Sequence, residues 1–263
     1  MIGLFLGEKK LPLEILKSLN KKKIKYFIID LSKNNKFKKY KSSYFINIGK
    51  FGKILELIKS KKCNKVLFAG HIVKPRFSKL KLDLKGIYYI PRIIKASKLG
   101  DAAILKELIN ILSENKIKVI KLNRYNPELT LSKGCYTKLK PSMNDELTIK
   151  KGIQILNKSN SLNHVQALVI NNQKVVSIEK RSGTKGMLKS IRNNYLQNKL
   201  LLKMPKSKQD LRVDLPTIGL DTLKDCKKAN IKGIVVKAGQ NIFLDKHEGI
   251  KFANKNNIFV MAK

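Results

Sequence analysis

The sequence of 263 residues contains no tryptophan and has only three cysteines and three histidines. The cysteines are Cys63, Cys135 and Cys226. They lie far apart, without a Cys-x-x-Cys pair or a histidine at ligand spacing, so we expect neither a disulfide framework nor a zinc site. His71, His164 and His247 are isolated as well. Only His71, which follows Gly70 at the end of an apolar run, is expected to face a cleft.

Long hydrophobic runs are also missing. The longest ones, such as Val66–Gly70 and Ile231–Val236, are far shorter than the roughly 20 residues that a membrane-spanning helix needs. Met1–Gly7 is apolar, but no basic region precedes it and no small-residue cleavage site follows it, so we expect a first strand and a cytoplasmic protein. Hydrophobic residues still make up 43% of the chain and are spread along it, which is typical of a protein with buried cores.

Acidic residues are scarce, and the net charge of +39 raises the question of an anionic partner. Lysine outnumbers arginine by 51 to 6, whereas nucleic-acid readers usually rely on arginine. The lysines are dispersed, without the interleaved aromatic residues of a single-strand binding platform. The composition therefore predicts a lysine-coated surface and no nucleic-acid partner, and it leaves an anionic substrate or membrane surface as a use for the charge.

The first half of the sequence alternates short β-rich runs with helical patterns. Strands are predicted at Ile2–Leu6, Ile24–Asp30, Tyr44–Ile48, Lys65–Ala69 and Lys118–Leu122. Helices are predicted from about Pro12, at Phe51–Ser60 and, after an Asp101 N-cap, at Ala102–Ser113. This alternation indicates an α/β fold with a Rossmann-like N-terminal domain, residues 1–122, whose mostly parallel sheet has helices on both faces.

Periodicity fades over residues 123–144, which we interpret as a linker, and returns in a mixed α/β C-terminal domain at residues 145–263. Its predicted strands are Gln166–Ile170, Val175–Ile178, Gly233–Val236 and Ile258–Met261, and its predicted helices are Glu146–Asn157, Gly186–Leu201, Thr222–Asn230 and Lys246–Asn256. The Asn171-Asn172 pair between the first two of these strands is a hairpin signal.

The segment Lys203–Gly219 has the densest set of charged groups. These groups are Lys203, Lys206, Lys208, Asp210, Arg212 and Asp214. Their alternation with apolar residues predicts a strand that carries the last three on one face. Such charges either pair with one another or bind a ligand. In the second case a carboxylate holds a divalent metal or takes a proton from water, while the cations neutralise a pyrophosphate.

Glycine-bearing turns follow three of the predicted strands. The glycines are Gly7, Gly49, Gly52 and Gly70. Ligands of open α/β sheets gather at the carboxyl ends of strands, and backbone N–H groups of such turns bind phosphate. None of the turns forms a G-x-G-x-x-G motif or a P-loop, so neither NAD nor ATP is predicted, and each glycine alone is also explained by its turn. Gly183-Thr184, before a basic helix, is either a second anion site or a plain N-cap.

Taken in order, these segments resemble the LpxI family of UDP-2,3-diacylglucosamine pyrophosphatases over essentially the whole chain. The matching segments are Gly7 with Lys10-Leu11-Pro12, Ile48-Gly49 with Phe51-Gly52-Lys53, Phe68-Ala69-Gly70 with Pro75, Gly100-Asp101, Gly183-Thr184 with Met187-Leu188, Lys206–Gly219, and Ala238-Gly239. Gln209–Gly219, with the sequence QDLRVDLPTIG, is the specific part. The other segments are weak singly and are distinctive through their order and spacing.

The resemblance implies hydrolysis of UDP-2,3-diacylglucosamine to UMP and 2,3-diacylglucosamine 1-phosphate (lipid X) in lipid A biosynthesis, with Mg²⁺ or Mn²⁺, by a catalytic C-terminal domain. The essential aspartate of the family falls on Asp214, which would hold the metal or orient the water that attacks the β-phosphate. Arg212 and Lys206 would stabilise charge on the phosphoryl oxygens. The substrate contacts that we expect are Gly7, Lys10, Gly70, His71, Gly183, Thr184, Gln209, Asp210 and Thr217.

A diacyl substrate also implies peripheral contact with the cytoplasmic face of the inner membrane of a Gram-negative bacterium, and a homodimer is one option for the assembly. The sequence departs from the family pattern at three places. Gly7-Glu8-Lys9 stands where more glycine is usual, and Ser182, Lys185 and Lys237 stand where acidic residues are common. If those carboxylates hold metal in other members, this chain has fewer ligands.

Two other functions stay open at this point. A nucleotide-sugar transferase or a deacylase would use the same cleft, but transfer would release UDP instead of UMP. A non-catalytic basic module would bind anionic lipid or nucleic acid. For such a module Asp214→Asn would have no effect, whereas high salt or removal of lysines would abolish binding.

Overall fold

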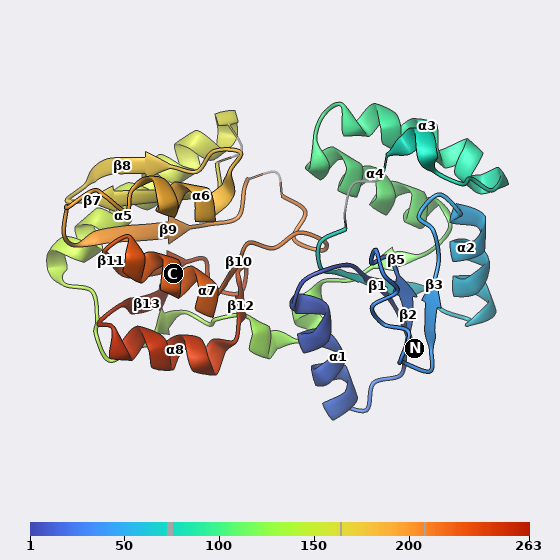
Figure 1. Ribbon diagram of the computed structural model, residues 1–263, viewed down its shortest axis with the longest axis horizontal. Coiled ribbons are helices and arrows are strands. Elements are labelled where there is room, and N and C mark those ends of the chain that lie inside the picture. The colour runs from blue at the N-terminus through green and yellow to red at the C-terminus, as the bar shows by residue number, and fades with distance from the viewer. Residues whose placement is uncertain (73–75, 164, 208) are drawn as a thin grey trace. The chain divides into compact units, whose positions relative to one another are not determined.

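The structure is a computed structural model that describes residues 1–72, 76–163, 165–207 and 209–263 (Figure 1). It divides into two units: unit 1 comprises Met1–Asn126 and Arg212–Asp214, and unit 2 comprises Pro127–Leu211 and Leu215–Lys263. The chain therefore leaves unit 2 for one short turn and then returns to it. Each unit has a sheet and helices of its own.

Unit 1 is built on a five-stranded parallel sheet with the strand order β3-β2-β1-β4-β5. The strands are β1 (Ile2–Leu6), β2 (Tyr26–Asp30), β3 (Ser43–Phe45), β4 (Lys65–Ala69) and β5 (Lys118–Val119). The strand order reverses between β1 and β4, which makes the ends of these two strands the switch point of a Rossmann arrangement. The prediction of a Rossmann-like parallel sheet is confirmed.

Helices cover both faces of this sheet (Figure 1). They are α1 (Leu11–Lys21), α2 (Phe51–Ser60), α3 (Leu84–Ser97) and α4 (Asp101–Glu114), with 3-10 turns η1 (Phe77–Lys79) and η2 (Leu122–Arg124). On one face, Ile54 and Ile58 of α2 and Ile109 of α4 share a core with Phe5 and Phe68 of the sheet. α1 lies on the other face, and α3 packs on α2 and α4 as an outer helix.

Several details of unit 1 differ from the sequence prediction. β2 begins at Tyr26 rather than Ile24, and β3 covers Ser43–Phe45 rather than Tyr44–Ile48. α3 is not among the predicted helices, because its sequence is apolar on two faces and contains Pro91. Asp101 is the first helical residue of α4 rather than its N-cap. Gly100 takes the cap position with a φ of 103°, which glycine adopts without strain. The last strand ends at Val119, and Leu122 already begins η2.

Unit 2 contains a six-stranded mixed sheet with the order β6-β13-β11-β9-β7-β8. The strands are β6 (Gly134–Cys135), β7 (Ala167–Asn171), β8 (Lys174–Ile178), β9 (Lys199–Lys203), β11 (Ile231–Val236) and β13 (Phe259–Ala262). β9, β11 and β13 are parallel, whereas β7 runs antiparallel to both β8 and β9, and β6 is antiparallel to β13. The predicted mixed α/β fold and the β7–β8 hairpin are confirmed.

The helices of unit 2 are α5 (Met143–Asn163), α6 (Gly183–Ser190), α7 (Leu220–Lys228) and α8 (Lys246–Lys255), with a 3-10 turn η3 (Pro127–Leu129). α5 covers one face of the sheet through Ile149 and Leu156. α6, α7 and α8 cover the other face, where Leu188, Leu223 and Ala253 are fully buried. A separate parallel pair, β10 (Thr217–Gly219) and β12 (Ile242–Leu244), follows the charged segment. No helix in the described part of the chain is long and apolar enough to cross a membrane.

The predicted helix at Gly186–Leu201 is present only as far as Ser190 and is wrong beyond it. α6 ends at Ser190, and the chain returns as β9 in the middle of the sheet, between β11 and β7. The run Lys199–Lys203 has three consecutive leucines, and a short apolar run of this kind reads equally well as a buried strand or as part of a buried helix. The consequence is that lysines lie at both ends of a buried strand.

Candidate functional site

The turns that follow β1 and β4 meet at the switch point of unit 1. The N–H of Gly7 donates to the carbonyl of Ala69 (2.9 Å), and Glu8 and His71 exchange N–H to carbonyl bonds of 2.8 and 3.1 Å. A Cβ at Gly7 would lie 2.5 Å from the His71 oxygen, and one at Gly70 would lie 2.5 Å from the Glu8 oxygen. Both glycines therefore permit the close approach of two turns, and the N–H groups of Gly7, Glu8 and His71 are already bonded to carbonyls.

The carboxylates at this edge are engaged with backbone groups as well. Asp30 at the end of β2 is fully buried and accepts hydrogen bonds from the N–H groups of Ser32 (2.8 Å) and Phe37 (3.0 Å). Glu8 accepts one from the N–H of Lys33 (2.9 Å). These bonds satisfy N–H groups of the turn after β2 and hold that turn in place.

Gly49 and Gly52 contact the first turn of α3. Asp83 caps this helix and accepts hydrogen bonds from the N–H groups of Gly52 (3.1 Å), Lys53 (3.1 Å) and Gly86 (2.8 Å). Burial alone would raise the pKa of Asp83, but these donors outweigh it and hold the pKa below its ordinary value. Gly86 lies against the carbonyl of Gly49, where a Cβ would be only 2.1 Å away. The motif therefore clamps α3 to α2.

A buried ionic cluster lies at the carboxyl edge of the sheet of unit 2. Lys203 ends β9, Glu179 follows β8, and Thr184 lies in the first turn of α6. The Lys203 ammonium donates to the Thr184 hydroxyl (2.6 Å), which donates to a Glu179 carboxylate oxygen (2.6 Å). The ammonium lies 3.9 Å from that same oxygen. Because Lys203 is 8% exposed, the hydroxyl and the carboxylate offset the desolvation of its charge.

Two amide side chains fix the backbone around this cluster. Asn241, which is buried, donates to the carbonyl of Lys203 (3.1 Å) and accepts from the N–H that follows β11 (3.0 Å). The Gln209 side-chain oxygen accepts from the N–H of Lys206 (2.9 Å) and from the Gln166 amide (3.2 Å). The Gln209 amide nitrogen is buried and has no hydrogen-bond partner in the described part of the chain.

The segment Arg212–Asp214 belongs to unit 1. The chain turns at Leu211–Val213, so the predicted strand with three charges on one face is wrong. Val213 packs against the unit 1 core that contains Phe5 and Phe68, and this contact anchors the turn. Asp214 is half-buried, and its carboxylate has no hydrogen-bonding or ion-pairing partner among the described residues. A partly desolvated carboxylate without compensation is suited to bind a cation or a water molecule.

The remaining predicted site residues are at least partly accessible. In unit 1, Lys10 and His71 are exposed and Arg212 is half-buried; in unit 2, Gly183, Lys206, Asp210 and Thr217 are half-buried. The structure therefore brings Thr184 to the ionic cluster and Lys206 to Gln209. It brings Gly7, Gly70 and His71 together at the other sheet. Lys208, His164 and Pro75 lie outside the described residues.

The acidic side chains do not form a ready-made metal centre. Across the described residues, no three His, Cys, Asp or Glu side chains lie close enough together to hold a metal ion. Mg²⁺ usually takes one or two protein carboxylates and completes its shell with water and substrate phosphate oxygens. Asp214 fits the role of a single carboxylate ligand, whereas a site with three protein ligands does not fit the described residues.

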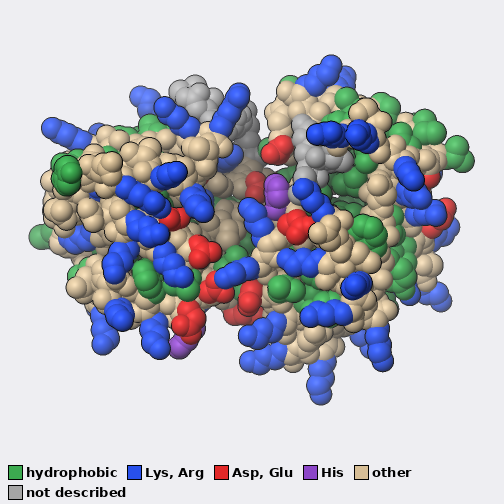
Figure 2. Space-filling model, in the orientation of Figure 1, with side chains coloured by type: hydrophobic (Ala, Val, Ile, Leu, Met, Phe, Trp, Pro, Cys, Tyr) green, Lys and Arg blue, Asp and Glu red, His purple; other side chains and the backbone are tan. Residues whose placement is uncertain are grey.

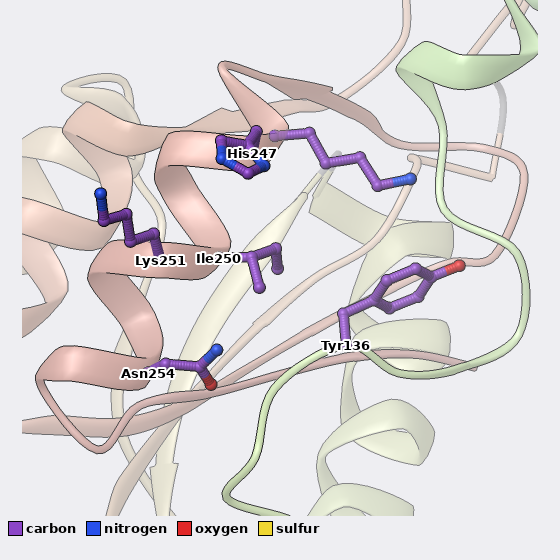
Figure 3. Close-up of a pocket in the computed structure, with 6 residues that line it drawn as sticks. Tyr136, His247, Ile250, Lys251 and Asn254 are labelled. Atoms are coloured by element: carbon purple, nitrogen blue, oxygen red, sulfur yellow. The ribbon is translucent and has the colours of Figure 1, made fainter.

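A groove on unit 2 lies between Tyr136 and one side of α8 (Figure 3). It is lined by Tyr136, Lys246, His247, Ile250, Lys251 and Asn254. The Lys246 ammonium lies 5.1 Å from the centre of the Tyr136 ring. These lining residues include no carboxylate and none of the predicted site residues, so the groove lacks the groups that hydrolysis of a pyrophosphate needs.

Comparison with known proteins assigns both halves of the chain. The LpxI N-terminal domain model matches residues 1–129, and the LpxI C-terminal domain model matches residues 132–261. The chain is 30% identical over 225 residues to the UDP-2,3-diacylglucosamine pyrophosphatase LpxI of Caulobacter vibrioides, and the alignment covers 82% of this chain and 80% of the relative. The chain belongs to the LpxI family. The N-terminal model ends three residues after Asn126, the first boundary between units 1 and 2, and the C-terminal model begins at residue 132.

Sequence reasoning did not select Glu179 and Asn241 as site residues of this LpxI-family chain, and it named Lys203 only as one of the cations of the charged segment. The wrong helix over Gly186–Leu201 hid β9, so Lys203 was not recognisable as the end of a buried strand. The signal that could have indicated Lys203 is its position directly after three leucines. A lysine at the end of a buried apolar run is buried only if it has a partner. Glu179 and Asn241 carry no local signal, because their partners are distant in the sequence.

Proposed function

We propose that the protein hydrolyses the pyrophosphate bond of UDP-2,3-diacylglucosamine and releases UMP and 2,3-diacylglucosamine 1-phosphate for lipid A synthesis. Membership of the LpxI family and the pyrophosphatase activity for which the Caulobacter vibrioides relative is named support this reaction. The structural observation that carries it is the half-buried Asp214 carboxylate, which has no partner among the described residues.

Asp214 orients the attacking water and accepts its proton, as a general base does. The water oxygen forms a bond to the β-phosphorus while the bond from this phosphorus to the bridging oxygen breaks. The bridging oxygen leaves with UMP, and the water oxygen remains in the sugar phosphate. Arg212 and Lys206 stabilise the negative charge that spreads over the phosphoryl oxygens, which is the main catalytic task in phosphoryl transfer.

The proposal includes a divalent cation, Mg²⁺ or Mn²⁺, with Asp214 as its protein ligand. Such an ion, when bound, neutralises phosphate oxygens and polarises the phosphorus. Gln209 offers buried N–H groups, and Thr184 and Lys203 provide a fixed hydroxyl and ammonium at the edge of unit 2.

The proposal also places the enzyme at an anionic membrane surface, because a diacylated sugar nucleotide resides in a bilayer. The net charge of +39 supports such peripheral binding, since each lysine near an anionic surface contributes about 1 kcal/mol.

The decisive experiment is to compare the wild type with Asp214→Asn on UDP-2,3-diacylglucosamine in detergent micelles with Mg²⁺, and to identify the products by mass spectrometry. We expect UMP and the sugar phosphate from the wild type, and a loss of about 100-fold or more in kcat for the variant at unchanged thermal stability. Asp221→Asn, which alters an exposed carboxylate of α7, is the matched control and should keep full activity.

Water enriched in ¹⁸O tests the direction of attack, because the label should enter the sugar phosphate and not UMP. Release of UDP would support the transferase instead. A folded wild type that binds anionic vesicles but releases no UMP with either metal would contradict the proposal and favour the non-catalytic module.

A further inference from the structure

α3 carries a second apolar face that no part of the described structure covers. Leu84, Ile87 and Tyr88 are 87%, 60% and 66% exposed, and we call these three side chains the outer face of α3. They recur at the spacing that places residues on one side of a helix. Ile94, one further step along the same side, is 36% exposed. Single exposed apolar residues are normal in proteins, but a continuous stripe on one helix marks an interaction surface.

The inner face of the same helix already fulfils the structural role. Tyr89, Ile90 and Ile93 are buried against α2 and α4 in a cluster that includes Phe51 and Ile111. The Asp83 clamp fixes the beginning of the helix. α3 is therefore held rigidly from the inside, and the fold of unit 1 does not require apolar residues on the outside.

The charged groups around the outer face are predominantly basic. Those that are exposed are Lys79, Lys81, Lys85, Lys95 and Lys98. The acidic groups nearby are engaged: Glu107 and Glu114 both bind Arg92, at 2.7 and 2.6 Å, and Asp83 accepts three backbone N–H groups. Asp101, at the start of the next helix, is exposed. Figure 2 shows hydrophobic and basic side chains side by side over the region of α3.

We propose that the outer face of α3 docks on an anionic lipid bilayer, with Leu84, Ile87 and Tyr88 at the boundary between headgroups and acyl chains and the lysines on the headgroups. A helix that lies in the membrane interface has this combination of a basic polar side and large apolar residues. Tyrosine suits the same depth, because its ring is apolar and its hydroxyl stays hydrated. The inference rests on the proposed function in that the diacyl substrate would bring the enzyme to a bilayer.

Charge decides between a bilayer and a second copy of this chain as the occupant. In a two-fold dimer the same patch faces itself, so the lysines around one outer face would oppose the lysines around the other. Like charges in that arrangement disfavour association, whereas anionic headgroups complement the lysines.

The absence of tryptophan from the chain permits a direct test. Tyr88→Trp introduces a single fluorophore on the outer face, and Tyr195→Trp introduces one at a site of unit 2 that is 88% exposed. With phosphatidylcholine vesicles that contain phosphatidylglycerol, emission of the Tyr88→Trp variant should shift to the blue and be quenched by brominated acyl chains. Emission of Tyr195→Trp should stay that of a water-exposed indole. Vesicle binding without a shift for Tyr88→Trp would overturn the proposal.

A second set of variants measures the contribution of the surface. Leu84→Gln, Ile87→Gln and Tyr88→Gln together should lower vesicle partitioning by about tenfold or more per large side chain removed from the interface. Met143→Gln with Leu147→Gln, which removes exposed apolar residues from α5, is the matched control and should leave partitioning unchanged. Circular dichroism checks that the variants are folded.

Hydrolysis in detergent micelles separates this inference from the proposed function, because micelles do not require docking on a bilayer. The triple variant should retain wild-type kcat there. Wild-type hydrolysis without vesicle binding would overturn the docking surface alone, and vesicle binding without hydrolysis would overturn the proposed function alone. A dimeric wild type whose triple variant is monomeric, or a triple variant that is inactive in micelles, would assign the outer face to a second copy or to the substrate instead.

Discussion

The carboxyl edges of the two sheets differ in the groups that fill them. In unit 1 the turns after β1 and β4 pair through backbone groups, and Asp30 is bonded to two N–H groups. In unit 2 the corresponding edge holds side chains: the ammonium of Lys203, the hydroxyl of Thr184 and the carboxylate of Glu179. The backbone N–H groups of Gly7, Glu8 and His71 donate to carbonyls, so these three donors are not open to a phosphate.

The two edges also differ in their tolerance of a side chain. Gly7 and Gly70 of unit 1 lie within 2.5 Å of carbonyl oxygens at the position where a Cβ would be placed. Gly183 of unit 2 has a φ of 71°, similar to the 86° of Gly70, yet no atom lies within 4 Å of the position that its Cβ would take. The comparison separates glycines that are needed for close packing from one that is needed only for its backbone conformation.

The largest effect is expected from Gly70→Ala. It combines a left-handed φ of 86° with a collision between Cβ and the Glu8 oxygen, and should destabilise unit 1 by about 3 kcal/mol or more. Gly183→Ala is the matched variant and should lower the free energy of unfolding of unit 2 by only about 1 kcal/mol, because alanine is strained at this φ but its Cβ collides with no atom. Hydrogen exchange read separately over peptides of each unit measures both values. Equal losses of stability in the two variants would mean that the collision of the new Cβ at position 70 has no effect of its own.

A second pair of variants compares the two buried lysines of β9. Lys203→Met removes the partner of Thr184 and Glu179 and should destabilise unit 2 by about 3 kcal/mol, because it leaves a carboxylate poorly compensated. It should also lower hydrolysis. Lys199 is fully buried, and its ammonium donates to the carbonyl of Asn194 (2.6 Å).

Burial lowers the pKa of Lys199, so its charged form is disfavoured in the folded state. Lys199→Met should therefore stabilise unit 2 by about 1 kcal/mol at neutral pH and leave hydrolysis unchanged. Denaturant unfolding and initial rates of both variants make the comparison. If Lys199→Met were the more harmful of the two, the ionic cluster would not be the important feature of this edge.

The smallest effect concerns stability at acid pH. Each unit has one carboxylate at the start of a helix whose pKa is lowered: Asp83 in unit 1 and Asp145 in unit 2. The N–H donors of Asp83 hold its pKa below the ordinary value despite burial. Burial would likewise raise the pKa of Asp145, but Lys232 (2.7 Å) and Ser142 lower it. Because both folded pKa values are depressed, each contribution is complete above the unfolded pKa of about 3.9 and is lost as the pH falls through the folded pKa.

Asp83→Asn should make the free energy of unfolding of unit 1 depend less on pH in the acid range, and Asp145→Asn should do the same for unit 2. Near neutral pH, each substitution should lower the free energy of unfolding by about 1 kcal/mol. Added salt should weaken only the contribution of Asp145, because the pKa of Asp83 is lowered by hydrogen bonds from backbone N–H groups and not by a cation. Hydrogen exchange in each unit as a function of pH and salt checks this. The same salt response in both units would contradict the distinction.

Local patterns were sufficient for much of the fold. β1, α2 and β4 have the predicted bounds, because their periodicity and their turn residues agree. The sequence also indicated the segment with Arg212 and Asp214. β9 and α3 could not be assigned, because consecutive leucines and a helix with two apolar faces give no single period.

The candidate site required long-range contacts. Periodicity and the hairpin signal indicated a two-part α/β chain from the sequence alone, because they depend on neighbouring residues, and the order of the motifs along the chain carried the resemblance to the LpxI family. Only the tertiary structure decided that Gly7 and Gly70 lie against carbonyl oxygens, that Lys203 lies near Glu179, and that Asp214 has no partner among the described residues. The physical reason is that burial and pairing of a charge depend on which strands become neighbours, and local periodicity does not encode that choice.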